Sequence, residues 1–144
     1  MSVTIAEAVS ESDRAACLAL RHQVFCVEQG VSLSDEQDGR DGEARHLLAR
    51  QDGTPVGALR LRVVGTAAKI ERVCVAEAAR GTGLGAALTR AALALAASMP
   101  GLTEAKLGAQ ITVVSFYERL GFTAHGPEYL DAGILHRDMA RPLP

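Results

Sequence analysis

The stretch ARGTGLGA (Ala79–Ala86) decides how the rest of this sequence is interpreted. Closely spaced glycines before apolar residues at helical spacing are typical of a loop whose backbone N–H groups bind phosphate at the start of a helix. Two such patterns fit the letters. Counted from Gly81 they match the dinucleotide fingerprint G-x-G-x-x-A, and counted from Arg80 they match R-x-x-G-x-G. The two patterns predict different ligands and different chemistry.

The neighbouring residues argue against a dinucleotide. That fingerprint needs its first glycine directly after a strand, and an acidic residue about 20 positions later at the end of the next strand. Here AEAAR separates the strand from Gly81, and Glu104 begins a strand instead of ending one. A nucleotide P-loop also fails, because no Lys followed by Ser or Thr comes after the glycines. The pattern that starts at Arg80 meets none of these objections.

The flanking sequence predicts an α/β fold with a mixed, largely antiparallel sheet. Alternating apolar residues indicate strands, and apolar residues three or four positions apart indicate helices. Asp52-Gly53 is a strong hairpin signal, because both residues tolerate positive φ. The polar stretch 30–43 is interpreted as an exposed, mobile loop with at most a helical turn. The expected strands are 3–8, 45–50, 56–64, 69–75, 104–109, 122–125 and 135–140, and the expected helices begin near Ser10 or Ser12, at Leu84 and near Ile111.

Length and composition predict one globular domain, residues 1–144, with 48% hydrophobic and 22% charged residues. A net charge of −2 and 3% aromatic residues give no basic surface and few stacking platforms, so we expect no nucleic-acid partner.

The N-terminus has no signal-peptide pattern, and the longest apolar run, 91–97, is too short to cross a membrane. Three unpaired cysteines without a C-x-x-C motif suit a reducing, cytoplasmic location. SDEQDGRD lacks the ligand spacing of a calcium loop, and we expect no metal.

An ordered set of motifs resembles the GNAT superfamily of N-acetyltransferases. The strand KIERVCV precedes ARGTGLG, and a helix, a short strand and SFYERLGF follow at the family's distances. The stretches LRHQVFCVEQ, RHLLA and DAGILHRDMAR are similar to the small ElaA-like branch. The resemblance covers nearly the whole chain. It implies a three-layer fold with helices on both faces of a twisted sheet, and acetyl-CoA as the acetyl donor.

The resemblance also implies which residues bind acetyl-CoA. The glycine loop would hold the pyrophosphate, and the backbone of Val73 and Val75 would pair with the pantetheine arm. A backbone N–H near Cys74 or Val75 would hold the oxyanion. Gln110 stands where the family often has Asn, so its amide is a pantetheine contact with one methylene more. The full set expected at the cofactor is Val73, Cys74, Val75, Arg80, Gly81, Thr82, Gly83, Leu84, Gly85, Gln110 and Phe116.

Acetyl transfer to an amine requires loss of a proton from the amine and an acid for the departing thiolate. By resemblance, Tyr117 protonates the sulfur; its alternative role is packing in an apolar helix face. Glu71 is the candidate base, and the alternative for it is a salt bridge to Arg60 or Arg62. Direct attack is expected, not an acyl-cysteine on Cys74. Glu28, His46 and His136 are candidates for the acceptor side, although each also suits a structural role.

We therefore predict an N-acetyltransferase that acts on a primary amine, either a small molecule or a peptide, in a ternary complex. Two alternatives stay open. The stretch R-x-x-V-F that begins at Arg21 is faintly similar to acyl-homoserine-lactone synthases. A non-catalytic acyl-CoA sensor would also keep the glycines. The sequence does not decide between a monomer and a homodimer.

Overall fold

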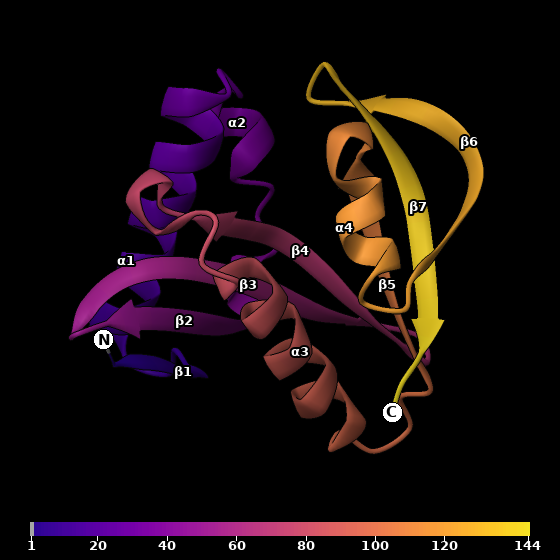
Figure 1. The fold of residues 1–144 in the computed structure, drawn as a ribbon, viewed down its shortest axis with the longest axis horizontal. Coiled ribbons are helices and arrows are strands. Elements are labelled where there is room, and N and C mark those ends of the chain that lie inside the picture. The colour runs from indigo at the N-terminus through magenta and orange to yellow at the C-terminus, as the bar shows by residue number, and fades with distance from the viewer. Residues whose placement is uncertain (1) are drawn as a thin grey trace.

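The computed structural model describes residues 2–144 and shows a seven-stranded twisted sheet, in the order β1-β2-β3-β4-β5-β7-β6 (Figure 1). Neighbouring strands are antiparallel except β4 and β5, which are parallel. The strands are β1 (Val3–Glu7), β2 (Arg45–Gln51), β3 (Thr54–Val64), β4 (Ala67–Val75), β5 (Glu104–Gln110), β6 (Thr123–Asp131) and β7 (Ile134–Pro142). The expected mixed, largely antiparallel sheet is thus confirmed.

In residues 2–144, four α-helices accompany the sheet. Ser10 begins the first of them as expected, because its side-chain oxygen accepts a hydrogen bond from the Asp13 N–H at 3.1 Å. This helix continues as a π-helical segment, His22–Glu28. The α-helices are α1 (Glu11–Arg21), α2 (Leu33–Glu36), α3 (Leu84–Ala97) and α4 (Val114–Glu118), with single 3₁₀ turns at Asp41–Glu43, Glu77–Ala79 and Ile111–Val113.

The helices cover both faces of the sheet, as Figure 1 shows. The sheet has one buried hydrophobic cluster on each face, because successive residues of a strand point to opposite sides. Leu47 of β2 belongs to the larger cluster, with Leu88 of α3. Leu48, the next residue, belongs to the smaller cluster, with Cys17 of α1. The sheet is therefore the middle layer of three.

Two expectations need correction. The strand expected at 122–125 extends over Thr123–Asp131. A register shift between His125 and Tyr129 accommodates the residues HGPEY within this strand. The stretch 30–43 is not simply an exposed loop. It contains α2, and the Glu36 side chain is buried against the equally buried Arg21, with Nε–Oε1 at 2.7 Å. By contrast, Asp52 and Gly53 both adopt the positive φ expected at the hairpin.

Candidate active site

The candidate site is a cleft of about 610 Å³ that opens where β4 and β5 separate. The two parallel strands pair only from Ala67–Glu104 to Lys69–Lys106 and then diverge. One wall of the cleft comes from the π-helical segment and α2, and the other from α4 and the β6–β7 turn. The glycine loop closes one end. We call this space the β4–β5 cleft.

A bulge in β4 presents free backbone groups to the β4–β5 cleft. Arg72 has φ +56°, and the pairing with β3 shifts register between Ala58 and Arg60. Beyond the bulge, the Ala76 N–H bonds to β3 at the Val56 carbonyl. Because backbone groups alternate between the two edges of a strand, the N–H groups of Val73 and Val75 point to the unpaired edge. The Cys74 N–H points to β3, so Val75 is the better placed of the two residues expected at the oxyanion.

The glycine loop presents a row of unpaired donors. Across the part of the chain that the structure describes, the backbone N–H groups from Gly81 to Ala86 have no hydrogen-bond acceptor. Gly81 and Gly83 have φ of +77° and +82°, and no protein atom lies within 4 Å of where a Cβ would stand at either. Gly85 packs under Phe116, whose ring would lie 3.4 Å from a Cβ at this glycine. Such an array at the start of a helix is suited to an anion.

Two of the residues expected in this loop are engaged within the protein. Arg80 donates to the Val75 carbonyl at 3.0 Å and pairs with Glu28 at 2.7 Å. Glu28, which was expected on the acceptor side, thus lies beside the glycine loop, where it lines the β4–β5 cleft. Thr82 donates its hydroxyl to the Ala79 carbonyl at 2.6 Å and does not line the cleft. The loop is thus fixed by its own side chains while its backbone stays free.

Tyr117 lies between the core and the β4–β5 cleft. Its ring contacts Phe116 and Phe122 edge-to-face, and burial raises the pKa of its hydroxyl to about 12. Within residues 2–144 the Tyr117 hydroxyl has no hydrogen-bond partner. Every fully buried side-chain nitrogen or oxygen in this range does have a partner, so the hydroxyl oxygen is not fully buried. The hydroxyl must therefore reach the cleft, which Tyr117 lines. Its surroundings suit packing, and its free hydroxyl suits proton donation.

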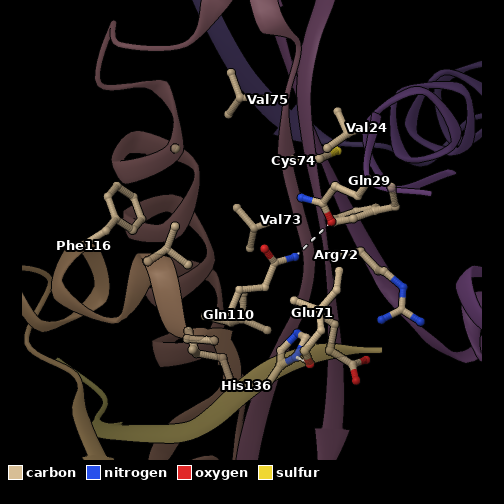
Figure 2. A pocket seen from close by; sticks show the side chains of 18 of the residues that line it. Val24, Gln29, Glu71, Arg72, Val73, Cys74, Val75, Gln110, Phe116 and His136 are labelled. Carbon is tan, nitrogen blue, oxygen red and sulfur yellow. Dashed lines mark hydrogen bonds between the residues drawn. The ribbon is translucent and has the colours of Figure 1, made fainter. Parts of the chain in front are cut away.

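Glu71 forms the salt bridge that was the alternative to a catalytic role. Its carboxylate accepts hydrogen bonds from Arg60 at 2.9 and 3.1 Å and from Arg62 at 2.7 and 3.2 Å. Burial opposes ionisation of this carboxyl, but the two guanidinium groups outweigh burial and lower its pKa. Glu71 nevertheless lines the β4–β5 cleft (Figure 2). The lowered pKa favours the ionised form of Glu71, whose charge is paired with Arg60 and Arg62.

Other groups at the cleft were not anticipated from the sequence. Gln110 donates to Gln29 at 3.0 Å, and Figure 2 shows this bond reaching across the β4–β5 cleft. Tyr129 packs over Gly108, donates to Asp138 at 2.7 Å and stacks on His136. Gln29 and Tyr129 carry no motif, and only the fold brings them to the expected residues.

The histidines expected at the acceptor side separate. His136 lines the β4–β5 cleft, and its Nδ1 lies 2.7 Å from the Ile134 carbonyl. His46 does not line the cleft. It is buried on β2, and its Nε2 lies 3.0 Å from the Asp41 carbonyl. The structural role is therefore the one that the geometry gives His46.

Two carboxylates at the cleft carry no partner. Asp35, in α2, and Asp131, at the end of β6, line the β4–β5 cleft from its two walls. Among the residues described, neither side chain forms a hydrogen bond or an ion pair. The nearby Arg72 is engaged with the carbonyls of Asp35 and Glu36. The two walls of the cleft thus each carry a carboxylate without an ion-pair partner among the described residues.

Residues 2–144 contain neither a cluster of metal-binding side chains nor a membrane-spanning helix. No three His, Cys, Asp or Glu side chains gather in a way that could hold a metal ion. No helix in this range is both long and apolar enough to cross a membrane.

Comparison with known proteins identifies relatives over almost the whole chain. Residues 8–143 match the family model described as "Acetyltransferase (GNAT) domain". The structure of ElaA from Escherichia coli superimposes with a TM-score of 0.87 at 31% identity, covering 97% of this chain and 99% of that one. An acyl-CoA N-acyltransferase from Pseudomonas aeruginosa gives 0.85 at 34%, covering 98% and 99%. The uncharacterized N-acetyltransferase YjcF of Bacillus subtilis is 36% identical, covering 85% of this chain and 87% of the relative. The expected resemblance to the ElaA-like branch is confirmed.

Proposed function

The chain belongs to the GNAT family of acetyltransferases, and from that premise we propose that it transfers an acetyl group from acetyl-CoA to a primary amine by direct attack in a ternary complex. The observation that carries the proposal is the row of unpaired N–H groups from Gly81 to Ala86, which opens into the β4–β5 cleft. We assign the pyrophosphate of acetyl-CoA to this row. The pantetheine arm then runs along the unpaired edge of β4, at Val73 and Val75.

The thioester end of the arm meets the groups that the chemistry needs. A tetrahedral oxyanion forms when the amine attacks, and the free N–H of Val75 is the proposed donor to it. Carbon–sulfur cleavage then leaves a thiolate, and the Tyr117 hydroxyl is the proposed donor to the sulfur. A pKa of about 12 keeps Tyr117 protonated at every working pH. Direct attack by the amine is favoured over an acyl-cysteine on Cys74. Burial raises the pKa of the Cys74 thiol to about 12, which leaves this thiol a poor nucleophile.

The attacking amine must first lose a proton, since a lysine-like amine has a pKa of about 10.4 in water. We propose that Glu71 acts on this step as a fixed negative charge that holds the incoming ammonium, with the proton passing on to water. The lowered pKa of Glu71 supports this role over that of a general base, because a carboxylate with a lowered pKa accepts a proton less readily. The original candidate role, a general base, is tested by the pH dependence of the Glu71→Gln variant.

The free carboxylates narrow the acceptor class. We propose an acceptor with a second cationic group, such as a diamine or a peptide with a basic side chain, because Asp35 and Asp131 leave negative charge unneutralised at the cleft. Asp131→Asn should raise the KM of a diamine several-fold and change the Kd of acetyl-CoA little. Glu128→Gln, an exposed β6 variant outside the cleft, is the matched control. Equal effects of the two variants would refute this acceptor class.

The test of the function is release of CoA thiol from acetyl-CoA with a panel of mono- and diamines, with the acetylated product identified by mass spectrometry. Amine-dependent release supports an N-acetyltransferase. Tight acetyl-CoA binding without release for any amine would instead indicate a sensor. Efficient turnover only with longer acyl donors would favour the synthase-like alternative.

A further inference from the structure

A second hollow, of about 490 Å³, lies away from the β4–β5 cleft, between the middle of α3, the end of α4 and the end of β7. Figure 1 shows these elements together near the C-terminus. Arg90, Arg119 and Arg141 all line the hollow, and no acidic side chain does. We call it the arginine hollow. Most other arginines of residues 2–144 lie within 4.0 Å of a carboxylate, and these three do not.

The arginine hollow has a fixed member and two free ones. Arg141 donates to the carbonyls of Leu120 and Pro142 at 2.7 and 2.9 Å. Gly121 makes room for its guanidinium, since a Cβ there would stand 2.9 Å from the Arg141 Nη1. Arg90 and Arg119 are exposed and form no hydrogen bond or ion pair with any described residue. Three like charges in one hollow, none of them in an ion pair with a described residue, repel one another, and a bound anion would relieve that repulsion.

We propose that the arginine hollow binds a phosphate monoester. Guanidinium groups present several N–H donors in a planar fork that matches phosphate oxygens, and three of them around one hollow suit a doubly charged anion better than a carboxylate. Pro144, the last described residue, also lines the hollow, but neither its carboxylate nor that of any other described residue lies within 4.0 Å of these guanidinium groups. The ligand class is thus a phosphomonoester, and it has two sources: the 3′-phosphate of CoA, or a separate phosphorylated molecule.

Helix geometry makes the first source attainable. Arg90 follows Gly83 by seven residues, which places it about 10 Å along α3 and within about 20° of the same side. Phe116 packs on Gly85, and Arg119 follows Phe116 by less than one turn. The ribose that carries the pyrophosphate of CoA also carries its phosphomonoester. This source rests on the proposed binding of CoA to the glycine loop, whereas the second source does not.

The experiment compares CoA with dephospho-CoA, which differ only in the 3′-phosphate, by calorimetry at low salt. The variant is Arg90→Gln/Arg119→Gln, and both side chains are free, so the fold should be kept. The matched control is Arg14→Gln/Arg137→Gln, because these arginines also lack a carboxylate partner and lie outside the arginine hollow. In the wild type and the control, CoA should bind about tenfold or more tightly than dephospho-CoA. In the variant the ratio should fall to about one, with dephospho-CoA affinity unchanged.

Thermal unfolding in inorganic phosphate tests the second source. If CoA and dephospho-CoA bind equally to the wild type, phosphate should still raise its Tm, and the variant should lose that rise while the control keeps it. The proposal is overturned if the wild type does not discriminate between the two cofactors and phosphate stabilises the variant and wild type alike. Failure of both cofactors to bind would refute the glycine-loop assignment instead, and the phosphate measurement would still report on the arginine hollow.

Discussion

Replacing Gly83 by valine should remove acetyl-CoA binding without unfolding the protein. The residue has φ +82°, and no protein atom lies within 4 Å of its Cβ position, so the new side chain meets open space in front of the unpaired N–H groups. Gly101→Val is the matched control, because Gly101 has φ +83°, is equally open and lies beyond the other end of α3. Each variant carries a backbone strain of about 1–3 kcal/mol. Both apo proteins should therefore lose similar stability.

The ligand response should separate the two variants. Acetyl-CoA at about 100 times its Kd stabilises the folded wild type by about 2.7 kcal/mol, which is about 5–11 °C in Tm. Loss of two charge-assisted hydrogen bonds, each worth about 1.5–3 kcal/mol, weakens binding at least about 100-fold. The same acetyl-CoA concentration then stabilises Gly83→Val by about 0.4 kcal/mol or less, under about 2 °C.

The assay is differential scanning fluorimetry of each variant against its own ligand-free Tm. Gly101→Val should keep the full acetyl-CoA shift. NAD should not shift the Tm of any of these proteins, because the chain has no acidic residue placed to bind the NAD ribose. A full shift in Gly83→Val, or an NAD shift equal to that of acetyl-CoA, would refute the assignment of the pyrophosphate to this loop.

Three further predictions concern catalysis and stability. Tyr117→Phe keeps the ring and removes the proton, so kcat should fall about 10²–10⁴-fold while the Kd of acetyl-CoA is unchanged; unchanged kcat would make Tyr117 a core residue. Glu71→Gln should lower kcat/KM by the same factor from pH 6 to 9, whereas rescue at high pH would restore Glu71 as the base. The pKa values of Asp38, Asp41 and Glu71 are lowered by arginines, although burial is the largest single influence on the latter two and opposes it. The ion pairs of these carboxylates stabilise the folded state above the ordinary carboxyl pKa of about 4, and this stabilisation is lost as the pH falls through the lowered pKa values. In urea unfolding below pH 4.5, the free energy of unfolding of Asp38→Asn should therefore fall less steeply with pH than that of the wild type.

The sequence predicted the parts of the fold that depend on local signals. The glycine loop, the Ser10 cap and the Asp52-Gly53 hairpin are each decided by neighbouring residues, and each is present in the structure. These features were predictable because their physics acts within a few residues.

The missed features depend on partners far apart in the chain. The stretch 30–43 looked exposed because most of its residues are polar, yet Asp38 pairs with Arg60 across 22 residues. Gln29 and Gln110 are separated by 81 residues, so neither suggests the other. The ion pairing of Glu71 was foreseen as one of two alternatives, and only the positions of Arg60 and Arg62 show how many donors converge on it.

The short pairing of β4 with β5 has a mechanical consequence. Among residues 2–144, strand pairing joins the half-sheet β1–β4 to the half-sheet β5–β7–β6 through three residue pairs only. A pantetheine arm lying along the free edge of β4 would take the place of the missing strand and become the longest tie between the halves. The donor substrate would then be a structural member of the sheet. Amide hydrogen exchange in residues 104–106 of β5 and 139–141 of β7, which do not line the cleft, should slow when acetyl-CoA binds.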